Sequence, residues 1–191
     1  MALGAHNMIH FQIRHIPEVT STNTVVLEEA TQGAAEGLVV LTDHQTEGRG
    51  KPGNIWISPR GKNLLFSALL RPPLRPDQIP LLTQIACRAV AKTLREKYNI
   101  DSEFKRPNDV MVGTRKICGT LIEALSTPSK VEAVVVGIGL NVNAEADELP
   151  KDGTSMKVLT GKTYSLEDVL EYTLEELSSK VGEFYKTGTI K

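Results

Sequence analysis

A short basic, glycine-rich stretch decides how this sequence is interpreted, and it reads Gly48-Arg49-Gly50-Lys51-Pro52-Gly53-Asn54-Ile55-Trp56. An apolar run at 38–41 that predicts a strand precedes it, and a second extended run at 55–58 follows it. Three glycines let this loop bend and expose its amides. A flexible, basic loop of this kind favours binding of an anion such as phosphate. Trp56, the only tryptophan, offers a flat face on which a purine could stack.

The glycine spacing also matches the dinucleotide-binding pattern G-x-G-x-x-G, but the residues that follow argue against that site. The pattern requires a helix directly after the glycines. Here the segment 54–59 predicts a strand and then a turn. The Gly-Lys-Ser/Thr sequence of a P-loop is missing as well. Taken alone, the loop is equally typical of a surface connection with Trp56 in the core.

Length and composition set the class of protein. The chain has 191 residues, of which 40% are hydrophobic, and this predicts one globular domain over 1–191. A net charge of -1 gives no sign of bulk nucleic-acid binding. We find neither a bilayer-spanning apolar run nor a signal-peptide pattern, so we expect no membrane association. The two isolated cysteines, Cys87 and Cys118, fit a reducing, cytoplasmic setting.

The periodicity of apolar residues predicts an α+β fold. Strands are predicted at 9–14, 38–42, 63–70, 115–123 and 131–138, a long helix at 77–98, and a further helix that begins near Ser165. Several consecutive strands look hairpin-connected, so we expect a mixed, largely antiparallel sheet with helices on one face.

Polar residues at the ends of these elements form the candidate site. Ser21-Thr22-Asn23-Thr24 precedes an apolar run and is typical of a helix N-cap, yet it could also bind a small polar ligand. Gln45 can donate and accept hydrogen bonds, although it is also an ordinary turn residue. The turn around Pro107 displays Lys105, Asn108 and Asp109, which could serve an anion and its divalent metal or simply form a charged turn.

Together these motifs resemble the catalytic domain of the biotin protein ligase family. The resemblance runs from about Glu18 to Asn143 and rests on five motifs: Ser21-Thr22-Asn23; Gln45 with Gly48-Arg49-Gly50 and Trp56; Lys105-Arg106-Pro107-Asn108-Asp109; Lys116-Ile117-Cys118-Gly119 through Glu123; and Gly137 to Asn143. No single motif is decisive, but five in the right order are highly specific. The family fold is related to that of class II aminoacyl-tRNA synthetases.

The resemblance implies a two-step reaction. The biotin carboxylate attacks the α-phosphorus of ATP to give biotinyl-5′-AMP, and a lysine of a biotin carboxyl carrier domain then displaces AMP. Lys105 would be the central catalytic cation, with Arg49 as a second one. The implied biotin-site residues are Ser21, Thr22, Asn23, Gln45, Gly48, Arg49, Gly50, Lys51, Lys105 and Gly119. The implied nucleotide contacts are Arg49, Lys51, Trp56, Asn108, Lys116 and Asn141, and Asp109 would lie near Mg²⁺.

The sequence departs from the family pattern in several places. Arg106 stands where the family usually has Trp, which puts the shape of the pocket wall in question. Lys51 stands where Arg is common, so a bidentate phosphate contact is replaced by a point charge. We expect no N-terminal helix-turn-helix domain, and therefore no DNA binding, and we expect the C-terminal small β-barrel that many members carry to be absent or severely reduced. The family often pairs through its sheet, which is compatible with a homodimer.

Two other functions remain open at this point. A lipoate or octanoate ligase could use the same scaffold, although such enzymes favour a different glycine-rich signature. A non-catalytic biotin-binding protein, or one half of a split ligase, would also fit a chain that lacks the small β-barrel.

Overall fold

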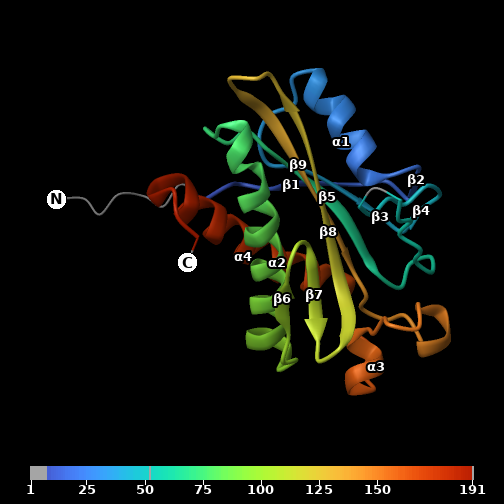
Figure 1. Ribbon diagram of the computed structural model, residues 1–191. Helices are drawn as coiled ribbons and strands as arrows, with labels where there is room; N and C mark the ends of the chain where they lie inside the picture. Colours follow the sequence, from blue (N-terminus) through green and yellow to red (C-terminus); the bar gives the residue numbers. More distant parts are fainter. Residues whose placement is uncertain (1–7, 52, 191) are drawn as a thin grey trace.

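A central β-sheet carries the other elements of the molecule (Figure 1). The computed structural model describes residues 8–51 and 53–190. Within these ranges seven strands form one sheet in the order β1-β3-β5-β9-β8-β7-β6. Their bounds are β1 Gln12–His15, β3 Leu38–Thr42, β5 Leu64–Leu70, β6 Glu103–Lys105, β7 Asp109–Val112, β8 Arg115–Ser126 and β9 Val131–Leu140.

The sheet is antiparallel apart from its β1–β3 edge, which is parallel. Strands β8 and β9 form a long hairpin that occupies the middle of the sheet. A small parallel pair, β2 (Glu18–Val19) and β4 (His44–Gln45), lies outside the main sheet. The prediction of a mixed, largely antiparallel sheet is confirmed.

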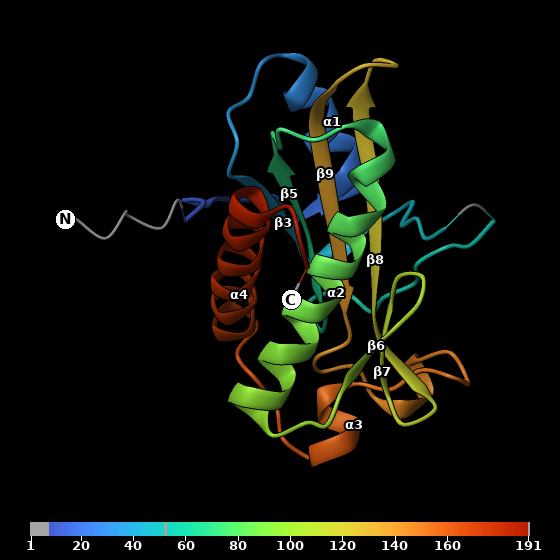
Figure 2. The ribbon, with the colours of Figure 1, turned by 60° about the vertical axis from the view of Figure 1, so that its left-hand side comes forward.

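Helices cover both faces of this sheet. The long helices α2 (Ile79–Tyr98) and α4 (Leu166–Thr187) lie side by side on one face (Figure 2), whereas α1 (Thr22–Thr31) packs on the opposite face. The expectation that helices cover one face only is therefore wrong. The reason is visible in β9, whose apolar residues are continuous, so that both of its faces need a hydrophobic cover.

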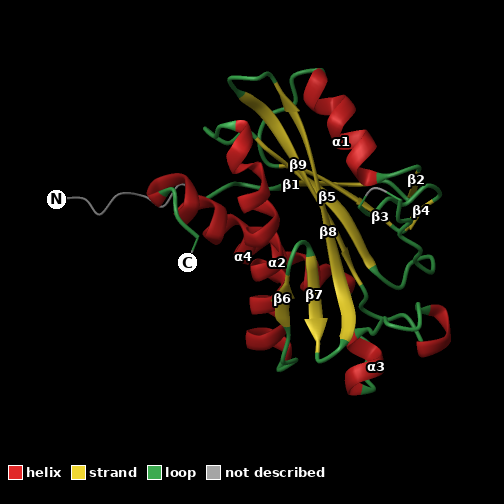
Figure 3. Cartoon of the chain, viewed as in Figure 1, coloured by secondary structure: helices red, strands yellow, loops and turns green. Residues whose placement is uncertain are grey.

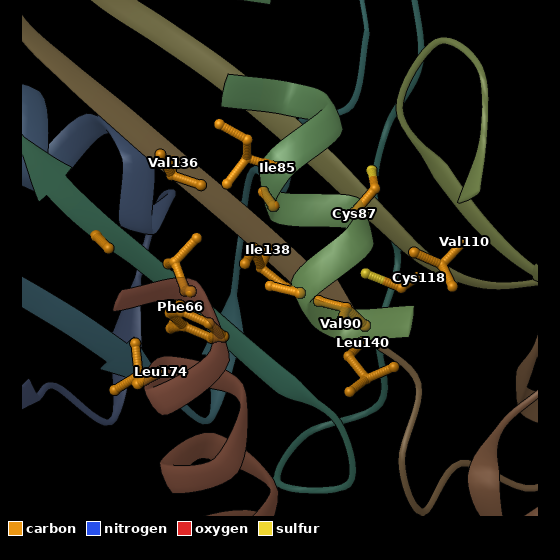
Figure 4. Close-up of a cluster of buried hydrophobic side chains, with 14 of the residues drawn as sticks. Phe66, Ile85, Cys87, Val90, Val110, Cys118, Val136, Ile138, Leu140 and Leu174 are labelled. Atoms are coloured by element: carbon orange, nitrogen blue, oxygen red, sulfur yellow. The ribbon is translucent and has the colours of Figure 1, made fainter. Parts of the chain in front are cut away.

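Alternate residues of β9 contribute to the two cores. Val134, Val136 and Ile138 join the larger cluster under α2 and α4, while Ala133 and Val135 join the smaller cluster under α1. Figure 4 shows part of the larger cluster. This alternation follows from the two-residue repeat of a strand, and it fixes the register of the sheet between its helices.

The remaining elements are short (Figure 3). They are α3 (Met156–Thr160) and two 3₁₀ turns, η1 at Pro76–Gln78 and η2 at Ala146–Glu148. The first strand covers Gln12–His15 rather than the predicted 9–14. The extended run at 55–58 forms only an isolated bridge, between Ile55 and Arg49. Over the described residues, no helix is both long enough and apolar enough to cross a bilayer.

The core predicts a specific loss of stability. Phe66 of β5 is completely buried in the cluster of Figure 4. Phe66→Ala should lower the free energy of unfolding by about 3–5 kcal/mol because it removes buried surface and leaves a cavity. Urea denaturation measures this change. Ile57→Ala is the control, since Ile57 is 73% exposed and should shift the free energy by no more than about 0.5 kcal/mol. Equal shifts for both variants would contradict this assignment of the core.

Candidate functional site

A cavity, here called the central pocket, opens where the start of α1, the loop 48–56 and strands β8 and β9 meet. Sequence-predicted residues supply much of its lining, namely Ser21, Thr22, Asn23, Gln45, Arg49, Gly50, Lys51, Trp56, Asn108, Asp109, Lys116 and Gly119. Gly137 and Gly139 line it as well, so residues from all five motifs meet in one place. The predicted residues Gly48, Lys105 and Asn141 do not line this pocket.

Gln45 is held in one orientation by the start of α1. Its Oε1 accepts hydrogen bonds from the Thr22 amide at 2.9 Å and from Thr22 Oγ1 at 3.2 Å. Thr22 Oγ1 in turn accepts from Ser67 Oγ of β5 at 2.7 Å. These bonds leave the Gln45 Nε2 group available as a donor for a ligand.

Ser21 is the N-cap residue of α1, but its hydroxyl makes no capping hydrogen bond. Its side chain lines the central pocket and is nearly buried, at 4% exposure. The helix-cap interpretation of the Ser21-Thr22-Asn23 motif therefore fails for Ser21. Its hydroxyl remains available to donate or accept a hydrogen bond in the pocket.

Asn23 ties α1 to the sheet. Its Nδ2 donates to Glu123 Oε2 at 2.8 Å and to the Leu121 carbonyl at 3.3 Å, and its Oδ1 accepts from Ser67 Oγ at 2.6 Å. A Cβ atom at Gly137 would lie 2.2 Å from Asn23 Oδ1, so only glycine fits there. Because its polar atoms are already bonded, Asn23 shapes the pocket wall more than it offers hydrogen bonds to a ligand.

The glycine-rich loop folds back on itself beside the pocket. The Trp56 amide donates to the Gly48 carbonyl and the Gly50 amide donates to the Asn54 carbonyl, both at 2.9 Å. A Cβ atom at Gly48 would lie 2.3 Å from the Trp56 carbonyl oxygen. Gly48 thus permits the close return of the loop, although it does not line the pocket.

Arg49 connects this loop to the sheet. One of its terminal nitrogens lies 2.9 Å from Glu123 Oε2 and 3.1 Å from Thr24 Oγ1. Its side chain is 44% exposed, so the ion pair is accessible to solvent and contributes little to stability. An anion in the pocket can compete for this guanidinium.

Trp56 stands over two glycines of the sheet. A Cβ atom at Gly139 of β9 would lie 2.6 Å from the indole ring, and one at Gly119 of β8 would lie 3.0 Å from it. The Trp56 Nε1 atom is buried and has no hydrogen-bond partner among the described residues. The ring therefore offers both an apolar face and a free donor.

Lys116 is the cation that reaches deepest toward these groups. Its Nζ lies 2.7 Å from Asp109 Oδ1 and 5.6 Å from the centre of the Trp56 ring, which is within cation–π range. Within the described chain, the charged residues of the pocket lining are Arg49, Lys51 and Lys116 against Asp109. This balance of charge favours an anionic ligand.

Lys105 lies outside this arrangement. It is exposed at the end of the edge strand β6, where its backbone is in register with Asp109 of β7. It is therefore one strand farther from the pocket than Asp109 is. No ion pair or hydrogen bond of its side chain is found over residues 8–51 and 53–190. Of the lysines in the two basic motifs, Lys116 is therefore the one that the fold brings into the pocket.

A second cavity, here called the outer pocket, shares part of its wall with the central pocket. Trp56, Asn54, Ile55 and Lys116 line both cavities, while Asn141 lines only the outer pocket. The side-chain amide of Asn141 is already hydrogen-bonded. Its Oδ1 accepts from Asn63 Nδ2 at 3.1 Å, and its Nδ2 donates to the Thr154 carbonyl at 3.0 Å. Asn108, which was predicted with Asn141 as a nucleotide contact, lines the central pocket.

The sequence analysis did not identify Ser67 and Glu123 as residues that hold the pocket-lining side chains in place by hydrogen bonds. Ser67 bridges Thr22 and Asn23, and Glu123 bridges Asn23 and Arg49. Ser67 is a lone polar residue inside the apolar run of β5, and this exception to the pattern was a usable signal. No group of three or more His, Cys, Asp or Glu side chains in the described part of the chain is placed to hold a metal.

Comparison with known proteins assigns the family. A model of the biotin/lipoate A/B protein ligase family matches residues 16–141. The chain belongs to this family. It is 32% identical to the bifunctional ligase/repressor BirA of Bacillus subtilis over 90% of this chain and 52% of that protein. It is 28% identical to the biotin--[acetyl-CoA-carboxylase] ligase of Mycobacterium tuberculosis over 89% of this chain and 64% of that protein.

Solved biotin protein ligases share the fold. The ligase of Aquifex aeolicus in complex with biotin and ATP superposes with a TM-score of 0.78 at 30% identity, over 92% of this chain and 72% of that one. The Leishmania major ligase in complex with biotinyl-5-AMP gives 0.68 at 27% identity, over 90% of this chain and 75% of that one. These likenesses confirm the α+β, synthetase-like fold class. The chain spans about half the length of the first BirA relatives that it matches.

The packing of Trp56 on glycine leads to a direct test. Gly139→Ala should displace the indole, because the new methyl group would lie 2.6 Å from the ring. Trp56 is the only tryptophan, so its fluorescence should shift to longer wavelength and become more accessible to acrylamide quenching. Ser126→Ala, at the exposed end of β8, should leave both signals unchanged. An unaltered emission spectrum in Gly139→Ala would disprove the contact.

Proposed function

We propose that this protein is an ATP-dependent biotin ligase, which activates biotin as biotinyl-5′-AMP and transfers it to a lysine of a biotin carboxyl carrier domain. One observation carries the proposal: Lys116 and Trp56 line both the central pocket and the outer pocket. The central pocket holds fixed polar groups beside cations, and the outer pocket is lined in part by loop residues 53–57. An enzyme that joins a carboxylic acid to a nucleotide needs two such subsites that meet at positive charge.

The central pocket is the proposed biotin subsite. Ser21 Oγ and Gln45 Nε2 are free to bond a neutral group with both donors and acceptors, as the ureido ring of biotin has. Trp56 supplies an apolar face for the remainder of the molecule. The carboxylate would then lie toward the cations of the pocket.

The outer pocket is the proposed nucleotide subsite. It is lined by Trp56, Asn141 and the apolar side chains of Ile55 and Ile57, which are 78% and 73% exposed. Binding of the adenosine group would cover these apolar surfaces. Trp56 lines both subsites, so both halves of a biotinyl-adenylate would contact it.

Lys116 and Arg49 are the proposed catalytic cations. The attack of a carboxylate oxygen on the α-phosphorus brings two anions together, and a preorganised cation lowers that repulsion. Lys116 lies where the two pockets meet, and Arg49 can exchange its Glu123 contact for a phosphate. Lys51, which also lines the central pocket, would add charge near the phosphate. Bond formation to phosphorus releases pyrophosphate, and a lysine amine later attacks the acyl carbon and releases AMP.

Magnesium would arrive with ATP. Asp109 is the carboxylate of the central pocket, and its Oδ1 lies beside Lys116 Nζ. Mg²⁺ in nucleotide sites is usually held by one or two carboxylates and by the substrate phosphates, a pattern that a single Asp109 can satisfy. The ion would neutralise phosphate charge.

Exchange of labelled pyrophosphate into ATP tests the first half-reaction. We expect exchange that requires biotin, because the reverse of adenylation returns pyrophosphate to ATP. Lipoate is the matched alternative acid, and exchange with lipoate alone would move the assignment to lipoate ligation. No exchange with either acid would refute an adenylating activity of this chain.

Two lysine substitutions test which lysine is the catalytic cation: Lys116, as the structure suggests, or Lys105, as the sequence resemblance implies. Lys116→Ala should slow biotin-dependent exchange by about 10²–10³-fold, because it removes a preorganised charge from the reacting centre. Lys105→Ala should slow exchange by less than about tenfold, since this side chain is exposed at the edge strand. The opposite order of effects would return the catalytic role to Lys105. Circular dichroism of both variants provides the control for folding.

Arg49→Ala addresses the role of the loop. Because Arg49 is proposed to bind phosphate rather than biotin, the variant should weaken retention of biotinyl-AMP by about tenfold or more, which corresponds to the loss of a charged hydrogen bond. Biotin affinity should change little in calorimetry. Equal losses for biotin and biotinyl-AMP would contradict a phosphate-binding role.

A further inference from the structure

A third cavity adjoins the central pocket on the side of α2. This lateral groove lies between Pro80, Thr83 and Gln84 of α2, the turn residues Arg106 and Pro107, and Ile122 of β8. The four residues Lys51, Asn108, Thr120 and Leu121 line both the groove and the central pocket, so the two cavities share one wall.

The groove exists because β7 is shorter than β8. The last residue of β8 with a partner on β7 is Gly119, which pairs with Asp109. The next residue of β8, Thr120, is hydrogen-bonded by Asn108 instead of by a strand residue. The Asn108 carbonyl accepts from the Thr120 amide at 2.9 Å, and Asn108 Nδ2 donates to the Thr120 carbonyl at 2.6 Å. The side of β8 beyond Thr120 therefore borders the groove instead of another strand.

Asn108 carries an unused acceptor at this shared wall. The residue is only 8% exposed, and its buried Oδ1 has no hydrogen-bond partner among the described residues. A buried carbonyl oxygen without a donor is costly, so a partner is expected when the site is filled. Carboxylate and phosphate oxygens cannot be that partner because they are acceptors themselves. An amine can, since it brings N–H donors.

The rest of the groove suits the side chain that carries such an amine. Pro80, Pro107, Leu121 and Ile122 give it apolar walls that fit the methylene stem of a lysine. Lys51 and Arg106 add positive charge at the groove, and Arg106 donates to Gln84 Oε1 at 3.4 Å. Neighbouring cations disfavour an ammonium ion and thereby favour the neutral amine, which is the nucleophilic form.

We propose that the lateral groove is the route by which the acceptor lysine enters the site, with Asn108 Oδ1 accepting a hydrogen bond from its amine. This inference rests on the proposed ligase function. The amine nitrogen forms the new amide bond to the acyl carbon of the mixed anhydride, and the bond from that carbon to the AMP oxygen breaks. The AMP phosphate takes the bonding electron pair, and the amine proton passes to solvent.

A bulky group placed in the groove after folding tests the route. Thr83→Cys introduces a half-buried thiol into the groove wall. The native thiols do not compete for a maleimide, because Cys87 and Cys118 are buried, and burial raises the pKa of Cys87 to about 12 and that of Cys118 well above its usual value. Labelling with a large maleimide then compares one folded protein before and after the groove is filled.

The label should reduce biotin transfer to a biotin carboxyl carrier domain by on the order of tenfold or more, while biotin-dependent pyrophosphate exchange stays within about twofold. Hydroxylamine, a small nucleophile, should still react with the enzyme-bound adenylate. Glu96→Cys carrying the same label is the matched control, because Glu96 is exposed on α2 and does not line the groove.

Two results would overturn the route. Undiminished transfer by the labelled Thr83→Cys protein would show that the lysine enters elsewhere. An equal loss of exchange and transfer would show that the groove serves adenylation. Both differ from a failure of the proposed function itself, in which even the unlabelled protein would show no biotin-dependent exchange.

Discussion

The site depends on glycines in the middle of the sheet, which leave space that larger side chains would fill. Strand β9 carries large apolar residues along most of its length, and β8 carries them at intervals, but glycines interrupt the two strands at Gly119, Gly137 and Gly139. The first and last leave room for the Trp56 ring, and Gly137 leaves room for Asn23. A close-packed sheet would otherwise have no depression on this face. The glycines thus admit both the aromatic wall of the pocket and the polar end of α1.

A second constraint is the chain of hydrogen bonds that begins in the buried strand β5. Ser67 orients Thr22 and Asn23, Asn23 orients Glu123, and Glu123 holds Arg49. Each step goes from a more buried residue to a more exposed one, so the core fixes the pocket wall, while the Arg49–Glu123 ion pair at the end of the chain is exposed to solvent. A solvent-exposed ion pair is worth about 0–1 kcal/mol. Transfer of Arg49 from Glu123 to an anion therefore costs little.

The fold class was predictable because strand and helix periodicities are local properties of the sequence. The face taken by α1 was not predicted, since it depends on β9 being apolar on both sides. The site motifs were predictable as a set, because glycine-rich and polar segments at strand ends converge. Which lysine lies in the pocket was not predictable, because Lys105 and Lys116 have the same chemistry. Only the pairing of β6, β7 and β8 places Lys105 at the sheet edge and Lys116 in the pocket. Ser67 and Glu123 act through residues distant in sequence.

The arrangement of the three cavities limits what Arg106 can affect, the residue that stands where the resemblance led us to expect tryptophan. Trp56, which lines both proposed substrate subsites, comes from the glycine-rich loop and is not affected by Arg106. Arg106 lines neither of these pockets and belongs to the lateral groove together with Lys51. The substitution therefore alters the charge on the side from which an acceptor would approach. Under the proposed function, the groups that would contact biotin and the nucleotide stay in place, so we expect this change to affect acceptor choice rather than adenylation.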